Sequence, residues 1–578
     1  MVAIDNESMI MYCPPTILKS SRNNMERRKT KNMDTVKPIS AALLIFISGS
    51  ALANNGCPTI GIAERTPGMS GYQYATSGKH SLDKDGIVLF DYGSNYNNLG
   101  KWKNPYFNSN YANALYRDWL DTECSNDTIK SQFLRVADWY IETAVHKSGM
   151  ALWTHPFYTP YFDLQPGWIS GIGQARIAGV LYRANAITGD KKYLSIANEA
   201  MVPYTKNITD GGVVTFDNDA TWIEEAPDPK GRSYKILNGH ITALSGIADI
   251  YQITNDHQWK DLLVKGERAV SRDLHKFDGG FSSYYSLDWP VPARRTAERG
   301  GYNSLHVSQL IWMYDHFNNP EYLKWASHFQ SYDDNRDKYE ASYSVNAKTN
   351  GPEKAKALLF GSSWTTNEFP TTFTITPENP ARFKGIAIDA LDISRRPIDF
   401  NVKAYKNGRI VAHKDVNANE SLWRDVLFKW PVVADKLEVT FTKGDRITAL
   451  TSLMAIRNDI ELAPITNQCN RARKPDTTEI AYTFQYALDG SPSTKMSVRC
   501  DGWFFIPMKK GEPYLRVSGD GIDGATFRIK NSWNMKTWGP EKSVSVNSGE
   551  RIRINGKYAM ISFSKDVKAI TDISTAAK

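Results

Sequence analysis

Between Asn110 and about Tyr332, apolar positions recur at helical spacing, and the helical pattern is itself repeated. Similar short turns recur at Asp190, Asp256 and Asn319, which lie 66 and 63 residues apart. An Asp or Asn at this place predicts the N-cap of the helix that follows. The pattern predicts about four helix hairpins. Hairpins that cannot bury their apolar faces alone stack into a solenoid or close into an α/α toroid, and we expect the toroid.

After about Asp333 the pattern changes to short alternating runs separated by turn residues, as in Phe400-Asn-Val-Lys-Ala-Tyr. This alternation predicts strands and a β-sandwich. The expected fold class is therefore multidomain α plus β. The predicted domains are an N-terminal segment over 54–103 that packs on the helical domain, the helical toroid over 104–332, a β-sandwich domain over 333–466 and a β-rich domain over 467–578. Whether the β domains bind carbohydrate or only brace the helical domain is left open.

The beginning of the chain has the pattern of a secretory signal peptide with an upstream extension. Basic residues precede the apolar run 39–47, which ends in Ser50-Ala-Leu-Ala53. Cleavage near Ala53 removes 7 basic and 4 acidic residues and lowers the formal net charge from +8 to +5. We therefore expect a periplasmic or secreted protein that is not integral to the membrane after cleavage, and the mild positive charge suits an anionic polymer.

The number of cysteines is consistent with an exported protein that forms disulfides. Four cysteines follow the predicted cleavage point, and proximity favours Cys57 with Cys124 and Cys469 with Cys500, although three connectivities are open. No Cys or His spacing resembles a metal site, so we expect neither a metal nor a cofactor.

The chemistry is expected in three long loops over 154–166, 216–236 and 277–304, which are rich in aromatic and charged residues. The second loop contains Glu224 and Glu225, shortly before Pro227. Pro227 favours an extended backbone at the preceding residue, and neighbouring side chains of an extended segment point opposite ways. Only one of the two carboxylates can face a given cleft. We take Glu225 as the site carboxylate and Glu224 as a solvated or scaffold residue.

Several ordered motifs carry a resemblance to a known family. They are Gly167-Trp168-Ile-Ser-Gly-Ile-Gly-Gln174-Ala, Trp222-Ile-Glu224-Glu225-x-Pro227, Leu237-Asn238-Gly239 and Tyr302-x-x-x-His306-x-x-Gln309-Leu310. In this order they resemble the C-terminal catalytic domain of the D-glucuronyl C5-epimerases, which convert glucuronate to iduronate in heparan-type polymers. The resemblance covers about residues 104–332.

The resemblance implies three catalytic positions. The second glutamate of the family's Glu-Glu-Tyr-Pro motif corresponds to Glu225, and its tyrosine before the His-x-x-Gln-Leu run corresponds to Tyr302. A further site tyrosine corresponds to Tyr285. The chain departs from the family at Ala226, where the motif has a tyrosine, and Tyr234, Tyr284 or Tyr285 are the candidates to replace it.

The chemistry of such a reaction can be argued independently. Inversion at C5 removes a proton α to a carboxylate and returns one to the opposite face, so an acid and a base must flank the sugar. Glu225 and Tyr302 are the expected pair. Further candidates for substrate binding are cationic side chains, neutral hydrogen-bond donors and aromatic rings that can stack on a sugar. They are Arg294, Arg295, Arg299, His306, Asn238, Gln174, Trp168 and Tyr284.

Alternative functions remain open from the sequence. A polysaccharide lyase begins from the same enediolate but expels the C4 substituent, and a non-catalytic descendant would only bind glycans. A glycoside hydrolase would need a second carboxylate, for which Asp288 and Glu298 are candidates. The expected partner is an anionic polysaccharide rather than a nucleic acid, and homodimerisation is left open.

Overall fold

The computed structural model describes residues 57–61, 70–159, 162–280, 282–287, 302–347, 364–390, 393–421, 423–444, 446–459, 461–467, 470–473, 480–481, 487–489, 491, 493–498, 502–563 and 566–577. The predicted signal peptide, the pair Cys469 and Cys500, and the arginine-bearing loop 288–301 lie outside these ranges. The described residues fall into two compact units. One contains residues up to 310 and 324–465, and the other contains 311–323 and the residues from 466 onward.

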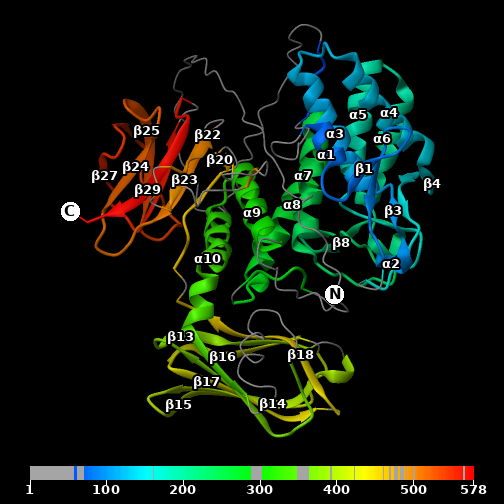
Figure 1. Ribbon diagram of the computed structural model, residues 1–578. Helices are drawn as coiled ribbons and strands as arrows, with labels where there is room; N and C mark the ends of the chain where they lie inside the picture. The colour runs from blue at the N-terminus through cyan, green and yellow to red at the C-terminus, as the bar shows by residue number, and fades with distance from the viewer. Residues whose placement is uncertain are drawn as a thin grey trace, which may run out of the picture. The chain divides into compact units, whose positions relative to one another are not determined.

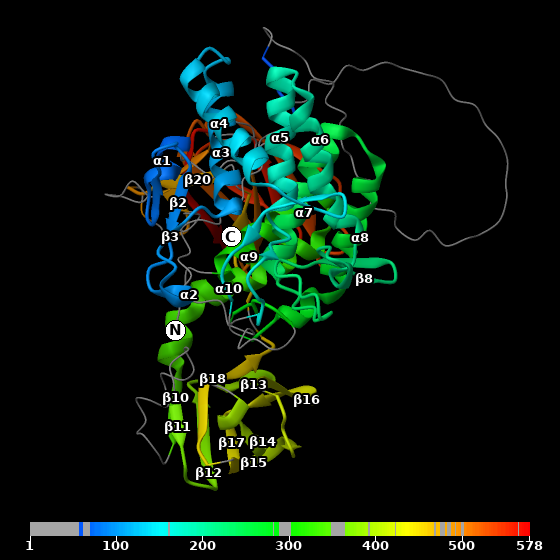
Figure 2. The same ribbon diagram turned by 90° about the vertical axis from the view of Figure 1, so that its right-hand side faces the viewer.

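Eight consecutive longer helices follow the N-terminal segment, as the repeated pattern predicts (Figures 1 and 2). In chain order they are α3 (Pro105–Asp121), α4 (Asp127–Thr143), α5 (Gln174–Thr188), α6 (Lys191–Met201), α7 (Leu237–Thr254), α8 (His257–Asp273), α9 (Tyr302–Phe317) and α10 (Pro320–Ser342). Helices α3, α5 and α7 pack side by side, and α4, α6 and α8 each pack on the helix before them. The helical region with about four pairs is confirmed, while its closure into a toroid stays a prediction. Helix α10 continues to Ser342, beyond the boundary predicted near Asp333.

The predicted N-caps are confirmed at all three repeated turns. The Asp190 side chain accepts a hydrogen bond from Lys192 N at 2.9 Å, and that of Asp256 accepts one from Gln258 N at 3.0 Å. Asn319 caps α10 in the same way through Glu321 N at 3.1 Å. These bonds satisfy amide groups that have no partner within the helix.

A buried ion pair joins α5 to α7. Both terminal nitrogens of Arg183 donate to the Asp249 carboxylate, at 2.8 and 2.7 Å, and the exposures of the two side chains are 0% and 8%. Gly179 lies directly against this pair, and a Cβ there would meet Asp249 Oδ2 at 2.8 Å. The absence of a side chain at Gly179 therefore makes room for the pair, and the bidentate geometry fixes the relative position of the two helices.

The segment before α3 forms a small sheet in the order β1-β2-β3. Its elements are α1 (Gly71–Thr76), β1 (His80–Leu82), β2 (Val88–Asp91), α2 (Asn95–Asn98) and β3 (Lys101–Trp102). Both α1 and β2 contact α3, so this segment packs on the helical region. A disulfide joins Cys57 to Cys124, as the sequence predicts.

Three two-stranded ribbons and short 3₁₀ helices occupy the connections between helices. They are β4 (Val145–Lys147) with β5 (Met150–Leu152), β6 (Thr154–His155) with β7 (Trp168–Ile169), β8 (Val214–Asp217) with β9 (Ala220–Ile223), and η2 (Val202–Thr205), η3 (Ile208–Asp210) and η4 (Leu274–Phe277). Among the described helices, none is both long and apolar enough to cross a membrane.

A first β-sandwich follows α10. One sheet has the order β10 (Tyr343–Ala347), β12 (Thr371–Pro377), β17 (Lys436–Gly444), β14 (Pro397–Lys406) and β15 (Arg409–Val416). The other has the order β11 (Trp364–Thr366), β18 (Thr448–Arg457), β13 (Ala381–Ala390) and β16 (Trp423–Ala434), with η5 (Ile393–Arg395) after β13. Alternate residues such as Phe373, Phe383 and Phe441 bury their side chains in one core between the sheets.

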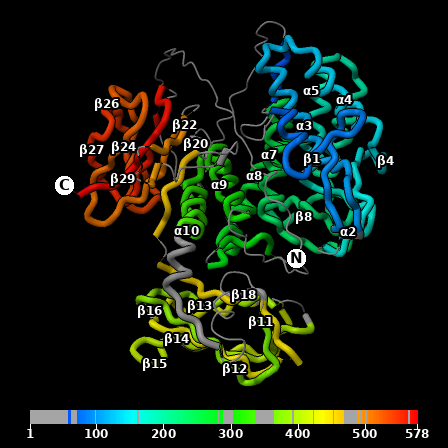
Figure 3. The backbone as a smooth tube through the Cα atoms, in the orientation of Figure 1, coloured from blue at the N-terminus to red at the C-terminus, as the bar shows by residue number. Residues whose placement is uncertain are grey.

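A second β-sandwich lies in the other unit and is traced in Figure 3. One sheet has the order β19 (Ile465–Thr466), β23 (Gly502–Pro507), β28 (Tyr558–Phe563), β25 (Ala525–Ser532) and β26 (Lys542–Val546). The other has the order β21 (Ile480–Ala481), β20 (Asn470–Arg473), β22 (Met496–Val498), β29 (Ala569–Ala576), β24 (Tyr514–Asp520) and β27 (Arg551–Arg553). The predicted succession of helices and then two β-rich regions is thus confirmed.

The buried ion pair gives a stability prediction. Arg183→Met leaves the Asp249 carboxylate buried beside an apolar side chain, so we expect a loss of about 3–5 kcal/mol of unfolding free energy. Urea unfolding followed by circular dichroism measures it. The control Arg135→Met breaks the exposed pair with Glu142 and should cost about 1 kcal/mol or less. The double variant Arg183→Met/Asp249→Leu should recover most of the loss, and equal losses in Arg183→Met and the control would contradict this account.

Candidate functional site

A cavity in the first unit collects residues from several parts of the chain. The N-terminal segment, the first turn of α3, the β6–β7 ribbon, the segment after β9, the segment that contains Tyr285 and the first turn of α9 all contribute side chains. The three predicted catalytic residues, Glu225, Tyr285 and Tyr302, line it together with Ala226 and with Trp168, which was predicted to bind substrate. The structure therefore brings these five positions to one place, although they span more than 130 residues of sequence.

Glu224 and Glu225 point to different surroundings. Glu224 is fully buried and accepts hydrogen bonds from Tyr234 N at 3.1 Å and Lys235 N at 3.2 Å, as well as from two hydroxyl groups. These bonds tie the end of β9 to the loop before α7. Glu224 is therefore a buried structural residue, held by neutral donors rather than by solvent or an ion pair.

Glu225 has no comparable set of partners. Its Oε2 atom is buried and has no hydrogen-bond partner among the described residues. Burial raises the pKa of this carboxyl from its ordinary 4.5 to about 7. The Glu225 side chain thus holds or releases a proton near neutral pH, as a general acid or base requires.

Two glycines make room for this segment. A Cβ on Gly239 would overlap the Oε2 and Cβ atoms of Glu225, and a Cβ on Gly171 would overlap the carbonyl oxygen of Glu224. The amide of Gly171 also donates to the carbonyl of Glu225 at 3.0 Å. Gly239 lies in the first turn of α7, so the Glu225 carboxylate sits at the positive end of that helix. This position favours the ionised form and opposes the effect of burial.

Two tyrosines face each other beside Glu225. The rings of Tyr285 and Tyr302 meet edge to face, with centroids 4.6 Å apart. Both pack in an apolar cluster that includes Ala226 and Trp168. The Tyr285 backbone is fixed because its carbonyl oxygen accepts from Leu237 N at 3.0 Å, at the start of α7. Two phenols therefore lie in the same cavity as the carboxylate of Glu225.

Trp168 stacks on a histidine that the sequence did not single out. The rings of Trp168 and His155 lie 3.9 Å apart and nearly parallel, and Trp168 Nε1 donates to Phe157 O at 2.9 Å. His155 also lines the cavity, and burial lowers its pKa to about 3, so its imidazole is neutral. One face of the indole is thus occupied by His155.

Four predicted substrate-binding residues lie outside the cavity lining. Asn238 and Gln174 are buried at the beginnings of α7 and α5. His306 is fully buried in α9, where its Nδ1 bonds Ser283 Oγ at 2.7 Å and burial lowers its pKa to about 3. The Tyr284 hydroxyl donates to Asp425 of β16 at 2.8 Å. His306 and Tyr284 thus bond to other parts of the chain, and contact of these four residues with substrate stays a prediction. Arg294, Arg295 and Arg299 lie outside the described residues, as do Asp288 and Glu298.

The tyrosines named as replacements at position 226 are also separated by the structure. Tyr234 donates to Phe162 O at 2.7 Å and to the Asp228 carboxylate at 3.0 Å, and it is not part of the cavity lining. Because the Tyr284 hydroxyl is bound to β16, Tyr285 alone among the three lines the cavity.

The sequence reasoning missed the contribution of the N-terminal segment. Lys79, Asp91, Tyr92 and Tyr96 of this segment line the same cavity, as do Asn104 and Tyr106 at the start of α3. Tyr92 accepts a hydrogen bond from Asn104 Nδ2 at 2.7 Å, and burial raises its pKa well above the ordinary value, so the phenol keeps its proton. The only sequence signal was that the resemblance begins at about residue 104, directly after this segment.

The cavity therefore offers proton-transfer groups in a largely apolar surround. A carboxyl with a pKa near 7, several phenols and a neutral imidazole can accept or donate a proton at a carbon acid. Within the described ranges, no three His, Cys, Asp or Glu side chains gather as a metal ligand set.

Comparison with known proteins finds a match to a known domain, which includes the cavity residues from His155 to Tyr302 but not those from Lys79 to Phe107. Residues 150–331 match the family described as D-glucuronyl C5-epimerase C-terminus. The D-glucuronyl C5-epimerase of Caenorhabditis elegans is 28% identical over 198 residues, which cover 31% of each chain. An uncharacterised protein of Methanocaldococcus jannaschii is 29% identical over 178 residues, covering 30% of this chain and 55% of that protein. The chain thus spans between about a third and about half of the length of these relatives.

The solved structures with local similarity include a carbohydrate-binding module and a lectin. The family 32 carbohydrate-binding module of Clostridium perfringens NanJ in complex with galactose is 18% identical, covers 20% of this chain and 95% of its own, and has a TM-score of 0.18. A fucolectin from striped bass (Morone saxatilis) serum is 13% identical, covers 42% of this chain and 97% of its own, and has a TM-score of 0.19.

The buried Glu225 carboxyl gives a prediction for the dependence of stability on pH. Its pKa is near 7 in the folded protein and near 4.5 in the unfolded chain, so the folded state holds the proton more tightly. Stability is therefore lost as the pH rises from about 4.5 to about 7. Glu225→Gln stays neutral and should be more stable than the parent above pH 7, by an amount on the order of 3 kcal/mol.

Urea unfolding at pH 4, 6 and 8 measures this difference, which should vanish at pH 4. Glu142→Gln, in an exposed side chain, is the matched control and should show no such trend. A Glu225→Gln variant that is equally destabilised at all three pH values would refute the assignment of a raised pKa.

Proposed function

Because residues 150–331 carry the C-terminal domain of the D-glucuronyl C5-epimerase family, we propose that this protein is a polysaccharide uronate C5-epimerase. It converts D-glucuronate to L-iduronate residues within an anionic, heparosan-like glycan. The observation that carries the proposal is the Glu225 carboxyl, buried with an unpartnered Oε2 atom in a cavity that it shares with Tyr285 and Tyr302.

The proposed reaction starts with the carboxylate of Glu225. It removes the C5 proton, and the electrons of the broken C5–H bond move into the substrate carboxylate, which becomes an enediolate. A phenol, from Tyr302 with Tyr285 beside it, gives its proton to C5 from the opposite face. The C5 configuration is then inverted, and a proton passes from Glu225 to the phenolate to restore the starting state.

The expected pKa values support Glu225 as the base and a tyrosine as the acid. A carboxyl with a pKa near 7 is a stronger base than an ordinary glutamate and is still largely ionised at slightly alkaline pH. An ordinary phenol, with a pKa of about 10, remains protonated there and donates well to a carbanion. The cavity thus holds one group ready to accept a proton and another ready to donate one.

A polysaccharide lyase is the second candidate, and Ala226 is the observation that favours it. The family's motif has a tyrosine at this position, and the chain has a buried methyl group instead. Loss of a proton donor would leave the enediolate free to expel the C4 substituent. Tyr285 packs in the same cluster as Ala226 and keeps a phenol beside it, which supports the epimerase.

We also propose that the protein acts outside the cytoplasm, as a periplasmic or secreted protein. The basic and apolar pattern before Ala53 supports this location, as does the disulfide between Cys57 and Cys124, a bond that persists in oxidising compartments.

The first test is deuterium exchange at C5. The purified protein is incubated with an uncleaved, unsulfated glucuronate–N-acetylglucosamine polymer in deuterated water and followed by NMR. We expect deuterium at C5, iduronate signals and intact chains. Glu225→Gln and Tyr302→Phe should each reduce exchange at least about a hundredfold, because each removes a proton-transfer group.

Tyr158→Phe is the matched control for the phenol. Tyr158 follows the cavity residue Phe157, but its own side chain is exposed and donates to Asp163 at 3.2 Å. The Tyr158→Phe variant should exchange deuterium at C5 as fast as the parent protein. Near-full exchange in both Glu225→Gln and Tyr302→Phe would reject the proposed site. New 4,5-unsaturated ends would instead identify a lyase, and new reducing ends a hydrolase. Binding without exchange would identify a glycan-binding protein.

A second prediction concerns pH. Glu225 must be ionised to remove the proton, so the exchange rate per enzyme at low substrate should rise about tenfold per pH unit up to about pH 7 and then level off. A stopped-time exchange series from pH 5 to pH 9 measures it. A plateau that already begins near pH 4.5 would mean that the base is an ordinary solvated carboxylate instead of Glu225.

A further inference from the structure

A short hairpin carries Tyr285 to the cavity. Its described residues are 277–280 and 282–287, and we call it the tyrosine hairpin. The amide of Tyr284 donates to Phe277 O at 2.7 Å, and this bond joins the two arms of the hairpin. The second arm contains Tyr284 and Tyr285 at adjacent positions.

The helical region binds the tyrosine hairpin along its backbone. Tyr285 O accepts from Leu237 N, at the start of α7, at 3.0 Å. The amide of Ser283 donates to Asn303 Oδ1, in the first turn of α9, at 2.9 Å. These two bonds hold the main chain of the hairpin, and they do not involve the rings of its two tyrosines.

The first β-sandwich binds the tyrosine hairpin through a side chain. The Tyr284 hydroxyl donates to Asp425 Oδ1 of β16 at 2.8 Å, and the Tyr284 side chain is buried. The next residue of that strand, Val426, lies in the core between the two sheets, so Asp425 projects from the outer face of its sheet. A hydrogen bond from a phenol to a carboxylate is stronger than one between neutral groups. This bond therefore ties the second arm of the hairpin to β16.

The same sheet contacts the tyrosine hairpin at two further points. Asp278 of the first arm is buried and accepts from Lys384 of β13 at 3.4 Å. A Cβ on Gly280 would lie 2.7 Å from Ile456 Cα of β18, so the backbone of the hairpin packs directly on that strand. Strands β18, β13 and β16 are neighbours in the sheet, which therefore supports both arms of the hairpin.

The bond of Tyr284 affects Tyr285 because the two residues are adjacent. Their side chains lead to different surroundings, Asp425 for one and the cavity for the other. Consecutive Cα atoms are only about 3.8 Å apart, so a shift of one residue moves the next. The Tyr285 ring in turn lies edge to face against that of Tyr302, with centroids 4.6 Å apart. A continuous series of contacts thus leads from β16 to the proposed proton donor.

We propose that Tyr284 and Asp425 are positioning residues, which hold Tyr285, and through it Tyr302, where a phenol can return a proton to C5. This inference rests on the proposed function, because it takes these two tyrosines as the acid of the epimerase. The first β-sandwich then has a part in the reaction without touching the sugar, although it lies after residue 331, where the domain shared with the relatives ends. A misplacement of about 1 Å in a reacting group can cost about a hundredfold in rate, so one hydrogen bond at this place has a measurable effect.

The position of the phenol decides between two fates of the enediolate. In deuterated water, Glu225 exchanges the proton that it has removed for a deuteron. Return of that deuteron from Glu225 gives C5-deuterated glucuronate, whereas a deuteron from the phenol on the opposite face gives iduronate. The ratio of iduronate to deuterated glucuronate at early times therefore reports how well the phenol is placed. A variant that is only less stable has fewer active molecules but the same ratio.

The test is this ratio, measured by NMR on the full chain with the unsulfated glucuronate–N-acetylglucosamine polymer. Tyr284→Phe and Asp425→Leu should each lower the ratio at least about tenfold, with a KM close to that of the parent. Asp425→Asn keeps an oxygen that can accept from Tyr284 and should retain most of the ratio. The double variant Tyr284→Phe/Asp425→Leu should have a ratio no lower than either single variant, because both substitutions remove the same bond.

Tyr193→Phe is the matched control. The Tyr193 hydroxyl donates to Asp138 at 2.6 Å and joins α6 to α4, and neither residue lines the cavity. The substitution removes a bond of the same kind from the scaffold and should leave the ratio unchanged.

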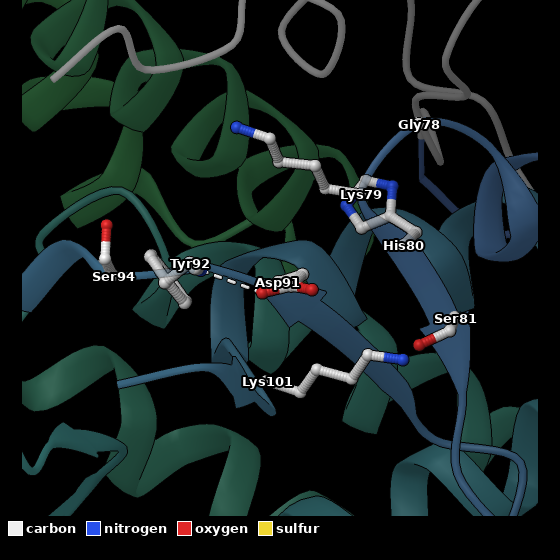
Figure 4. Close-up of a pocket in the computed structure, with 9 residues that line it drawn as sticks. Gly78, Lys79, His80, Ser81, Asp91, Tyr92, Ser94 and Lys101 are labelled. Atoms are coloured by element: carbon white, nitrogen blue, oxygen red, sulfur yellow. Dashed lines mark hydrogen bonds between the residues drawn. The ribbon is translucent and has the colours of Figure 1, made fainter. Parts of the chain in front are cut away.

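A second control removes a hydroxyl close to the cavity. Figure 4 shows a neighbouring cavity on the N-terminal sheet, which shares Lys79, Asp91 and Tyr92 with the first. Ser94 is exposed and lines the neighbouring cavity but not the first. Ser94→Ala should therefore also keep the ratio of the parent.

Two results would overturn the positioning role even if epimerisation proceeds. One is a ratio equal to that of the parent in both Tyr284→Phe and Asp425→Leu. The other is a raised KM in Tyr284→Phe together with the parent ratio in Asp425→Leu, which would assign Tyr284 to substrate binding instead.

A measurement without substrate keeps this proposal apart from the epimerase. Amide hydrogen exchange of the tyrosine hairpin, followed by mass spectrometry, should be at least about tenfold faster in Asp425→Leu than in the parent, and unchanged in Tyr193→Phe. If the parent shows no C5 exchange with the polymer, the epimerase is rejected, and faster amide exchange in Asp425→Leu still supports the anchoring of Tyr285. Unchanged amide exchange in Asp425→Leu would overturn that anchoring.

Discussion

Two carboxylates follow one another in an extended backbone, and Gly171 and Gly239 hold that backbone from two sides. A side chain on either glycine would collide with residue 224 or 225, so the segment has one position available. Because neighbouring side chains of an extended backbone point opposite ways, the Glu224 side chain faces the scaffold and the Glu225 side chain faces the cavity. Glu224 accepts four hydrogen bonds from neutral donors, whereas the Oε2 atom of Glu225 has no partner within the described residues, and burial raises the pKa of both carboxyls to about 7. Of the two carboxyls, only Glu225 lines the cavity.

A buried carboxylate without partners is costly, and only a rigid frame keeps it in place. Here the frame is the start of α7, whose first turn lies against Glu225 and whose first amide is bound by Tyr285 O. Farther along α7, the bidentate pair of Asp249 with Arg183 fixes that helix against α5. The same helix therefore takes part in the buried ion pair of the scaffold and in the placement of the Glu225 carboxyl. Its positive end also limits how far burial can raise the pKa of Glu225.

Periodic features of the sequence predicted the architecture because they depend on neighbours along the chain. Helix spacing, the caps at Asp190 and Asp256, and strand alternation are all local. The features that the sequence did not reveal depend on contacts between distant residues. Arg183 and Asp249 are 66 residues apart, and nothing in either segment marks them as partners. The sequence placed both Tyr284 and Tyr285 at the site, yet their side chains point to different surroundings, one to Asp425 and the other to the cavity. The role of the N-terminal sheet was missed for the same reason.

The part of the chain before the shared domain also provides phenol groups near Ala226, the position at which the family's motif has a tyrosine. Tyr92, Tyr96 and Tyr106 bring three phenols into the cavity from a segment before the shared domain. Tyr96 has a φ of +50°, a left-handed conformation that costs a bulky residue about 1–2 kcal/mol, and its ring packs 4.7 Å from that of Phe157. Such strain persists only where the surrounding contacts impose it, and here they turn the ring toward the cavity. The chain can therefore have a small residue at position 226 without losing phenols from the cavity. Ala226 packs in the same cluster as Tyr285, so in the proposed reaction a neighbouring segment, rather than the glutamate motif itself, provides the proton donor.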